Sequence, residues 1–579
     1  MKKCRLFIFS LCVVWACCGV VSAATYSANG AGALGNSSLI GGAGGEDYPT
    51  IAAAAADFNS VTSGMAGDYT FFINSDITET TNSGFGRNTN GFTLTYRPSL
   101  GKVVSVLNIC KADNNGPSGG LVFGHTDPAS GALDVTTPTV MKVVIDGTNT
   151  PGSITRDILF TYAKDFATEF PPGTAGGGYP RGINVWGDCT FVFKNFNLNL
   201  PVDNALITAI RSIYGILITS RRNAALGTDD IPNNWVIENC RVDAVGARQA
   251  HAIGASNSGT ITAGKAQTNW TIRNCFVTGQ TRGILLNQNS TGTLEQNTLR
   301  CTQLDSAGGL VSAPFIHASS NAVEGWTIKI DRNRLDQTET SATVAGGGIA
   351  GLQLSGAPGS GTGTTYTVTN NFISGFKFTH DIPVPGDYVY NGIVSASSRS
   401  KMEIYHNSIN MPNIPDVLGT TARYIAGICD TSTNALADFI VKNNIIRFDA
   451  GGTNAAIYAK NSTSLPVIDY NIIYQGAVVP FYAFGFNATN YANLATGQAA
   501  GFDVNGKAKD PFVADPPAAG VWTTWTNLHF TSDPGVNYTG TPTLLTVVPY
   551  DFDGTARTRP VSGAHEETRP ASVIDWAVF

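Results

Sequence analysis

Two acidic side chains stand at equivalent positions in neighbouring units of a repeated pattern. Glu295 and Asp331 each follow the first aliphatic residue of their unit. If the units stack as parallel strands, the two carboxyl groups lie ~5 Å apart, a separation that suits the carboxylate pair of a retaining glycosidase. Repulsion between the like charges would raise one pKa, as acid catalysis requires. The alternative is that both side chains diverge into solvent while Arg273 and Arg332 screen them.

A second group of candidate residues lies in two long loops, from Ser374 to Tyr390 and from Asn410 to Ala426. The loops belong to successive units, so they would leave the protein at one corner and form a wall. Loops that a rigid scaffold positions often carry function, and aromatic faces with a few polar groups suit sugar rings. The alternative is a pair of solvated loops whose tyrosines pack on the body of the protein. The predicted ligand-binding residues are His380, Asp381, Tyr388, Tyr390, Arg423 and Tyr424.

A polysaccharide lyase would need further groups. It must neutralise a uronate carboxylate, usually with Ca²⁺ held by several oxygens, and place a basic residue near the proton that is removed. The sequence has no Cys-x-x-Cys pair and no cluster of three acids with a basic partner. We therefore predict no metal and no cofactor; Ca²⁺ stays open without a motif that supports it.

These candidates would be positioned by a repeat that runs from Trp235 to Ile473. Each unit reads aliphatic, two variable residues, a slot residue that is usually Asn, one variable residue, aliphatic. A repeat of this length indicates stacked units. The slots are Cys240, Cys275, Asn297, Asn333, Asn371, Asn407, Asn444 and Asn471, so successive slot numbers differ by 35, 22, 36, 38, 36, 37 and 27.

A second pattern, a small residue followed by an aliphatic one, precedes nearly every slot. Each unit therefore holds at least two short strands, and the shortest spacing suits one bare coil of a β-solenoid, whose coils bury a shared core by stacking. Asn in the slot tolerates a left-handed bend, and its amide can bond to the Asn of the next coil. The pairs are Ala252-Ile253, Gly283-Ile284, Gly348-Ile349, Gly392-Ile393, Gly427-Ile428 and Ala456-Ile457.

The repeat resembles that of right-handed parallel β-helix proteins, the superfamily that also contains pectate lyases. The segment from Gly44 to Ile51 is similar to the entry of secreted bacterial β-helix proteins. The segment from Asp551 through Arg557 to Glu566 is similar to the closing segment of many such surface proteins. The resemblance implies an all-β, right-handed parallel β-helix and export. It carries no catalytic residue onto this chain, because the acid pairs of the polygalacturonase-like hydrolases are not recognisable.

The first residues form a predicted secretory signal peptide. A basic start precedes an apolar run from Leu6 to Val14, and Val21-Ser22-Ala23 is a small-residue cleavage site. No later stretch is long and apolar enough to span a bilayer. The net charge is −6 and no basic stripe is visible, so nucleic acid is not an expected partner.

Six of the ten cysteines remain after the predicted cleavage. Cys240 and Cys275 occupy the same slot in consecutive coils, and stacking would bring their Cα atoms within the range of a disulfide. The alternative, two free thiols packed as small apolar groups, is the one we favour, because side chains of a parallel ladder point the same way.

The predicted organisation is a signal peptide (1–23), an N-terminal cap with early irregular coils (24–150), a regular β-helix (151–473), and C-terminal coils with an irregular cap (474–579). A short helix after Thr50 belongs to the N-terminal cap. We predict an exported cell-surface or secreted protein that binds carbohydrate or is adhesive, with a polysaccharide or cell-surface glycan as its partner. The alternatives are a polysaccharide lyase or glycoside hydrolase on the same fold, and a structural surface component.

Overall fold

The computed structural model describes most of the chain from residue 36 to residue 564. The described residues are 36–41, 46–60, 64–81, 83–109, 120–124, 140–163, 181–201, 212–223, 228–245, 249–258, 265, 267–279, 282–287, 289–301, 316–320, 326–337, 349–356, 363–374, 388–397, 400–411, 424–431, 438–448, 453–459, 466–475, 481–486, 489–508, 544–558 and 562–564.

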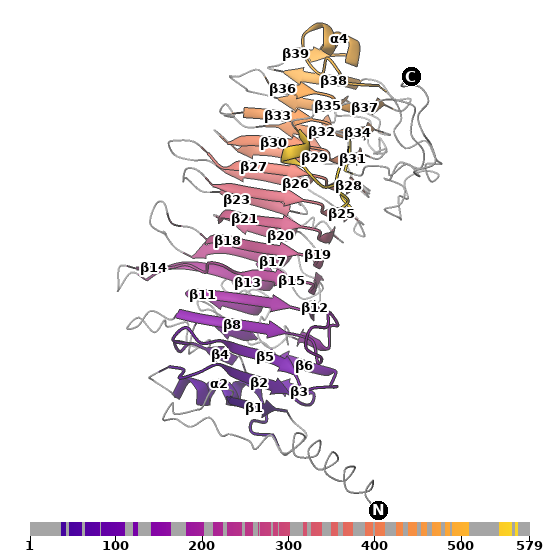
Figure 1. The fold of residues 1–579 in the computed structure, drawn as a ribbon. Coiled ribbons are helices and arrows are strands. Elements are labelled where there is room, and N and C mark those ends of the chain that lie inside the picture. The colour runs from indigo at the N-terminus through magenta and orange to yellow at the C-terminus, as the bar shows by residue number, and fades with distance from the viewer. Residues whose placement is uncertain are drawn as a thin grey trace, which may run out of the picture.

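The described strands form three long sheets, named A, B and C, which the chain visits in turn (Figure 1). Within each sheet, a strand pairs in parallel with its counterparts in the preceding and following coils. The two antiparallel pairs among the described strands are β13 with β14 and β38 with β39. The chain is a parallel β-helix, as the repeat predicts.

The bounds of the strands follow the order of each sheet. Sheet A contains β1 (Asn36–Ile40), β2 (Tyr69–Ile73), β5 (Leu94–Pro98), β8 (Val140–Asp146), β11 (Asp188–Lys194), β15 (Val236–Glu238), β18 (Gln267–Arg273), β21 (Asn289–Glu295), β24 (Thr327–Asp331), β27 (Thr365–Thr369), β30 (Lys401–Tyr405), β33 (Asp438–Lys442) and β36 (Val467–Asp469). Sheet B contains β3 (Ile77–Glu79), β6 (Val104–Ile109), β9 (Ile158–Ala163), β12 (Phe196–Pro201), β16 (Arg241–Val245), β19 (Phe276–Gly279), β22 (Thr298–Cys301), β25 (Arg334–Gln337), β28 (Phe372–Ser374), β31 (Ser408–Met411), β34 (Ile445–Phe448) and β37 (Ile472–Gln475). Sheet C contains β4 (Ser83–Phe85), β7 (Leu121–Phe123), β10 (Arg181–Trp186), β13 (Ser212–Asn223), β14 (Thr228–Asp230), β17 (Gln249–Ser258), β20 (Arg282–Asn287), β23 (Ile316–Ser320), β26 (Ile349–Gly356), β29 (Tyr388–Ser397), β32 (Tyr424–Asp430), β35 (Thr453–Ala459), β38 (Phe481–Phe486) and β39 (Thr489–Tyr491).

The repeated pattern spans the corner between sheets A and B. Its first aliphatic residue lies in sheet A and its second in sheet B, and both point into the core. The left-handed residue of the corner is the one before the slot, as in Asn370 (φ 55°) and Asn443 (φ 58°). The prediction that the slot Asn itself takes the left-handed conformation is therefore wrong: the slot side chain is needed inside, and the preceding residue makes the bend.

The slot asparagines form a continuous buried ladder from Asn297 to Asn471. Asn371 is typical and is fully buried. Its Oδ1 accepts from the backbone N (2.9 Å) and Nδ2 (3.0 Å) of Asn333, while its Nδ2 donates to Ile330 O and to Asn407 Oδ1, both at 2.9 Å. Every polar atom of the side chain is thus used twice, and the predicted bonding between slots of successive coils is confirmed.

The two cysteine slots use the same acceptors as the asparagines. Cys275 Sγ lies 3.7 Å from Ile237 O and 3.2 Å from Arg273 O, and Cys275 N donates to Asn297 Oδ1 (3.0 Å). Cys240 and Cys275 are free thiols in the structure, the alternative that the sequence favours.

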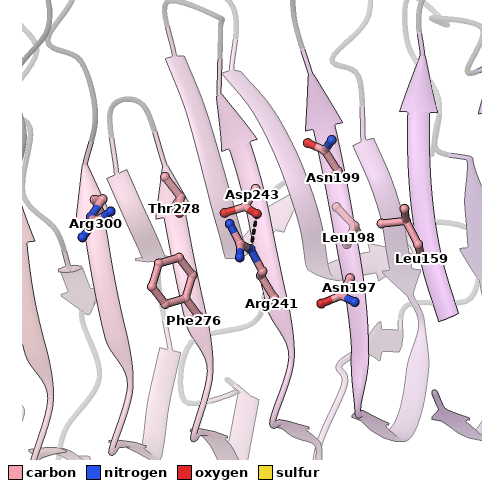
Figure 2. A pocket seen from close by; sticks show the side chains of 9 residues that line it. All are labelled: Leu159, Asn197, Leu198, Asn199, Arg241, Asp243, Phe276, Thr278 and Arg300. Atoms are coloured by element: carbon pink, nitrogen blue, oxygen red, sulfur yellow. Dashed lines mark hydrogen bonds and ion pairs between the residues drawn. The ribbon is translucent and has the colours of Figure 1, made fainter. Parts of the chain in front are cut away.

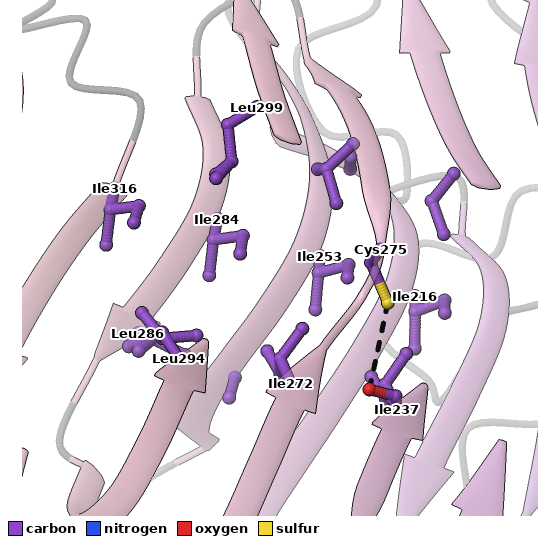
Figure 3. Close-up of a cluster of buried hydrophobic side chains, with 14 of the residues drawn as sticks. Ile216, Ile237, Ile253, Ile272, Cys275, Ile284, Leu286, Leu294, Leu299 and Ile316 are labelled. Atoms are coloured by element: carbon purple, nitrogen blue, oxygen red, sulfur yellow. Dashed lines mark hydrogen bonds between the residues drawn. The ribbon is translucent and has the colours of Figure 1, made fainter. Parts of the chain in front are cut away.

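The core contains columns of aliphatic side chains (Figure 3), and aromatic side chains such as Trp235 and Trp270 also stack in it from coil to coil. In sheet C, Ile253, Ile284 and Ile316 stack in register, and the next member of the column is Leu352. The small–aliphatic pair of that coil is therefore Gly351-Leu352, and the predicted pair at Ile349 is wrong by three residues, because Leu352 and not Ile349 pairs with Ile393 of the next coil.

A helix lies at the N-terminal end of the array (Figure 1). Helix α2 (Ile51–Ser60) buries Ile51 and Phe58 against the first coils. Thr50 Oγ1 accepts from Ala53 N (3.1 Å), so Thr50 caps the helix as predicted. The carboxylate of Glu79, in sheet B, accepts from the backbone N of Ile51 and thereby ties the helix to the solenoid.

The C-terminal end is closed by residues after β37. Helix α4 (Leu494–Ala499) follows β39, and the turn after it places Asp503 above Asn471 as the last member of the ladder: Asn471 N and Nδ2 donate to Asp503 Oδ1 at 3.0 and 3.3 Å. A short helix α5 (Leu544–Val547) leads into residues 548–558 and 562–564, here called the C-terminal clasp. None of the helices in the described residues is long and apolar enough to cross a membrane.

We expect the ladder to depend on every Asn within it. Replacing Asn371 by Ala leaves buried partners on both neighbouring coils without hydrogen bonds, and should reduce the free energy of unfolding by about 3 kcal/mol. Replacing Cys275 by Asn should change stability little, because the new amide can donate to Ile237 O and Arg273 O, the carbonyl groups that the thiol already contacts. Denaturant unfolding of the two variants checks this, and equal losses would contradict it.

We expect stability to depend on pH through Asp503. Burial raises the pKa of this carboxyl to about 7, nearby Asp469 adds to the rise, and the hydrogen bonds from Asn471 oppose it. The folded state therefore holds the proton more tightly than the unfolded chain. This contribution is complete below about pH 4 and is lost as pH rises through about 7.

Asp503→Asn should remove that part of the pH dependence and make the variant more stable than the parent above about pH 7. Thermal unfolding of both proteins between about pH 4 and about pH 8 measures the difference. Parallel profiles for the two proteins would show that Asp503 does not titrate in this range.

Candidate functional site

Glu295 and Asp331 are direct neighbours on the outer side of sheet A. They end β21 and β24 and face each other in the parallel register. The outward ladder predicted from the sequence is present, since Glu238, Arg273 and Glu295 also follow one another in register. Arg273 pairs with Glu238 at 2.9 Å, the alternating arrangement that favours cross-strand neighbours.

Arg332 bridges the two carboxylates. Its Nη2 lies 3.3 Å from Glu295 Oε2 and its Nε lies 3.0 Å from Asp331 Oδ2. Asp331 is 4% exposed and also accepts from Thr369 Oγ1 at 2.7 Å, while Lys329 Nζ lies 3.2 Å from its Oδ2. A guanidinium between the acids offsets their repulsion, and a buried carboxylate with these partners serves to hold the coils together. The catalytic role of the pair stays a prediction.

The predicted loop residues lie mostly outside the described part of the chain. His380, Asp381 and Arg423 are not among the described residues. Tyr388 and Tyr390 lie in β29, whose backbone pairs with β26 and β32, and Tyr424 begins β32. The structure therefore places the backbone of the three tyrosines in sheet C, and a binding role for all six residues stays a prediction.

An open groove of about 570 Å³ lies on the outer face of sheet B (Figure 2). It crosses five neighbouring strands, from β9 to β22, which corresponds to ~19 Å along the solenoid axis. The alternation of a β-strand turns every second side chain outward, so the lining forms two columns along this face. The lining residues are Leu159, Asn197, Leu198, Asn199, Arg241, Asp243, Phe276, Thr278 and Arg300.

Phe276 provides the aromatic surface of the groove. The guanidinium of Arg241, directly opposite in the neighbouring strand, lies 5.0 Å from the centre of the ring, and that of Arg300 lies 6.0 Å from it. Both distances fall within the range of cation–π contacts. The ring is thus supported from the two neighbouring coils, which keeps a flat apolar surface in place inside a polar groove.

The polar lining combines one ion pair with two amides. Arg241 Nε lies 2.6 Å from Asp243 Oδ2, and this pair stands on a single strand. Asn197 and Asn199 occupy the adjacent strand and align with Arg241 and Asp243 respectively. Amides, guanidinia and a carboxylate offer both donors and acceptors to a ligand rich in hydroxyl groups.

The groove lining contains a single carboxylate, that of Asp243, so the described residues offer no carboxylate pair there for glycoside hydrolysis. The described residues also contain no group of three or more His, Cys, Asp or Glu side chains that could hold a metal ion.

The groove was not predicted from the sequence, although the repeated pattern contains the residues that line it. The predicted ladder of charged residues used only the residue after the first aliphatic position of each unit, which lies in sheet A. The residues on either side of the second aliphatic residue also point outward. Those segments are Arg241-Val242-Asp243, Phe276-Val277-Thr278 and Thr298-Leu299-Arg300.

Comparison with known proteins does not assign this chain to a family. No protein-family model matches the chain, and no curated protein matches it. Among solved structures, it is similar to the Dettilon tailspike protein gp208, with 11% identity and a TM-score of 0.30 over 80% of this chain and 65% of the tailspike chain. It is also similar to PfbA, a surface adhesin of Streptococcus pneumoniae, with 10% identity and a TM-score of 0.32 over 71% of this chain and 89% of that one. At these values the likeness carries no argument about function.

We expect the acidic pair of sheet A to act in stability. Asp331→Ala should lower the free energy of unfolding by about 3 kcal/mol, because it leaves Arg332 and Thr369 without their buried partner. Glu295→Gln, at the more exposed position, should cost less. If a glycan that the protein cleaves is found, retained turnover in Glu295→Gln would agree with the structural role, and abolished turnover would instead support the catalytic hypothesis.

Proposed function

We propose that this protein is an exported parallel β-helix that binds carbohydrate in the groove on sheet B. The observation that carries the proposal is the outward ring of Phe276, held between Arg241 and Arg300 in an open groove with two amides beside it. A sugar ring presents apolar C–H faces and a rim of hydroxyl groups. The first would stack on Phe276 and the second would reach the amides and guanidinia.

The shape of the groove supports a shallow mode of recognition. Its lining comes from rigid strands of five consecutive coils, so the site is ordered before a ligand arrives and little conformational entropy is lost on binding. A groove that follows the solenoid axis for ~19 Å suits an extended chain better than a compact small molecule.

The predicted export signal supports a surface or secreted location for this activity, and adhesion to a glycan-coated surface is the role that fits both. Of the loop residues predicted from the sequence, Tyr388, Tyr390 and Tyr424 belong to strands of sheet C, so binding there would be a contact separate from the groove on sheet B. A polysaccharide lyase or hydrolase, and a purely structural surface component, remain as alternatives that the same experiment separates.

The test is a screen of the purified mature protein against a broad glycan panel, scored for retention and for product release, with and without Ca²⁺. Retention without product is the expected result. Unsaturated uronate products would make the protein a lyase, new reducing ends would make it a hydrolase, and no response to any glycan would favour the structural role.

We expect Phe276→Ala to weaken glycan binding by about tenfold or more, because the stacking surface is lost. Thr293→Ala is the matched control: it removes an outward side chain from sheet A, away from the groove. Both variants should unfold at the temperature of the parent within a few degrees. Binding that survives Phe276→Ala but is lost in Tyr388→Ala and Tyr424→Ala would move the site to the predicted loops.

A further inference from the structure

The outer face of sheet B is divided into two parts. Over β9 to β22 it is the open groove, whereas over β28 to β34 it is covered. Phe372 and Ile445, which point outward from β28 and β34, are fully buried. Phe552 of the C-terminal clasp packs on Phe372 with ring centres 4.5 Å apart, and Gly563 lies against Ile445.

The clasp is hydrogen-bonded to itself. Asp551 and Thr555 close a turn: Asp551 N donates to Thr555 O and Thr555 N donates to Asp551 Oδ1, both at 2.8 Å. Gly554 within this turn has φ 80°, a conformation that favours glycine. Phe552 N then donates to Ala564 O at 2.7 Å, which fastens the second part of the clasp to the first. These bonds give the segment a shape of its own.

The clasp has polar anchors on successive coils at the A–B corner. Arg557 holds both sides together, because its Nη2 donates to Asn370 Oδ1 (2.7 Å) on the solenoid and to Gly563 O (2.9 Å) within the clasp. Asn370 Nδ2 in turn donates to Tyr550 O (2.9 Å). The anchors beyond Asn370 are Ala564 N to Ser408 Oγ (3.0 Å), Gly563 N to Asn443 O (2.7 Å) and Ser562 Oγ to Tyr470 O (2.7 Å).

A cation–π contact extends the docked surface by a further coil, and an apolar contact adds to it. The guanidinium of Arg334, in β25, lies 4.8 Å from the centre of the Phe552 ring, and Val548 packs against Tyr405 in β30.

Gly563 has φ 92°, and a Cβ at this position would come within 2.5 Å of Ile445 Cδ1. Glycine is thus required there by both conformation and space.

In a solenoid each coil contacts only its neighbours, so the end coils can open one at a time. A segment anchored from β25 to the Tyr470 corner makes that opening cooperative, because the first coil to leave must break the clasp. We propose that the C-terminal clasp is a self-structured docking element whose binding site is the A–B corner of this chain's own coils from β25 to β37, and that its docking locks these coils into one unit.

The first test is hydrogen–deuterium exchange on the full-length mature protein. In Arg557→Ala, amides of β28, β31 and β34 should exchange about tenfold faster or more, because the variant loses several bonds to a charged group. Strands β12, β16 and β19 of the same sheet, outside the clasp, should not change. Ala556→Ser, at an exposed position in the clasp, is the matched control and should behave as the parent.

The second test asks whether docking needs the covalent connection. A specific protease site is placed between residues 509 and 543, and the protein is cleaved after folding. The clasp fragment should co-elute with the solenoid in size exclusion, and Arg557→Ala or Gly563→Val should release it. Two results would overturn the proposal. One is that the fragment leaves the cleaved parent protein and the exchange of β28 to β34 stays as in the uncleaved protein. The other is that Arg557→Ala raises exchange equally in all coils.

Discussion

The corner between sheets A and B is the constraint on which the rest of the molecule depends. The chain must bend sharply there in each coil, and the bend leaves backbone carbonyl groups facing the core. A buried Asn satisfies them: Asn333, Asn371 and Asn407 each bond the coil before and the coil after. The ladder therefore fixes the register of neighbouring coils, and the parallel sheets follow from that register.

A fixed register determines what each outer face presents. In sheet A it aligns charged residues, so that Glu295, Asp331 and Arg332 neutralise one another across coils. In sheet B the same register places Phe276 opposite Arg241 and near Arg300. The charged groups of sheet A thus form ion pairs that hold neighbouring coils together, while sheet B presents an aromatic ring and several polar groups to a ligand. This contrast is the physical reason for placing the binding site on sheet B.

Much of the fold could be predicted from the sequence, because coil stacking leaves a local and repeated trace. The slots, the core columns and the pairing of Glu295 with Asp331 all follow from spacing. The left-handed residue was misplaced by one position because Asn is frequent both in the slot and before it, as in Asn370-Asn371. Screening of the acids by Arg332 was one of the alternatives that the sequence offered, and its ion pairs with Glu295 and Asp331 agree with it. The burial of Asp331 could not be predicted, since spacing gives neighbours but not side-chain directions. The clasp could be recognised only as a motif, because Arg557 meets a residue 187 positions earlier.

The two ends of the ladder show how a repeating array is made finite. At its start, Cys240 and Cys275 take the slots, and a thiol supplies a weak donor to the same carbonyls without an amide oxygen for the coil before. At its end, Asp503 receives the two donors of Asn471 through one oxygen, and its other oxygen is buried without a hydrogen-bond partner. Neither the cysteine end nor the Asp503 end of the ladder can form the full set of Asn hydrogen bonds with a further coil. The residue types in the slots, as well as the covering helices, therefore limit the length of the ladder.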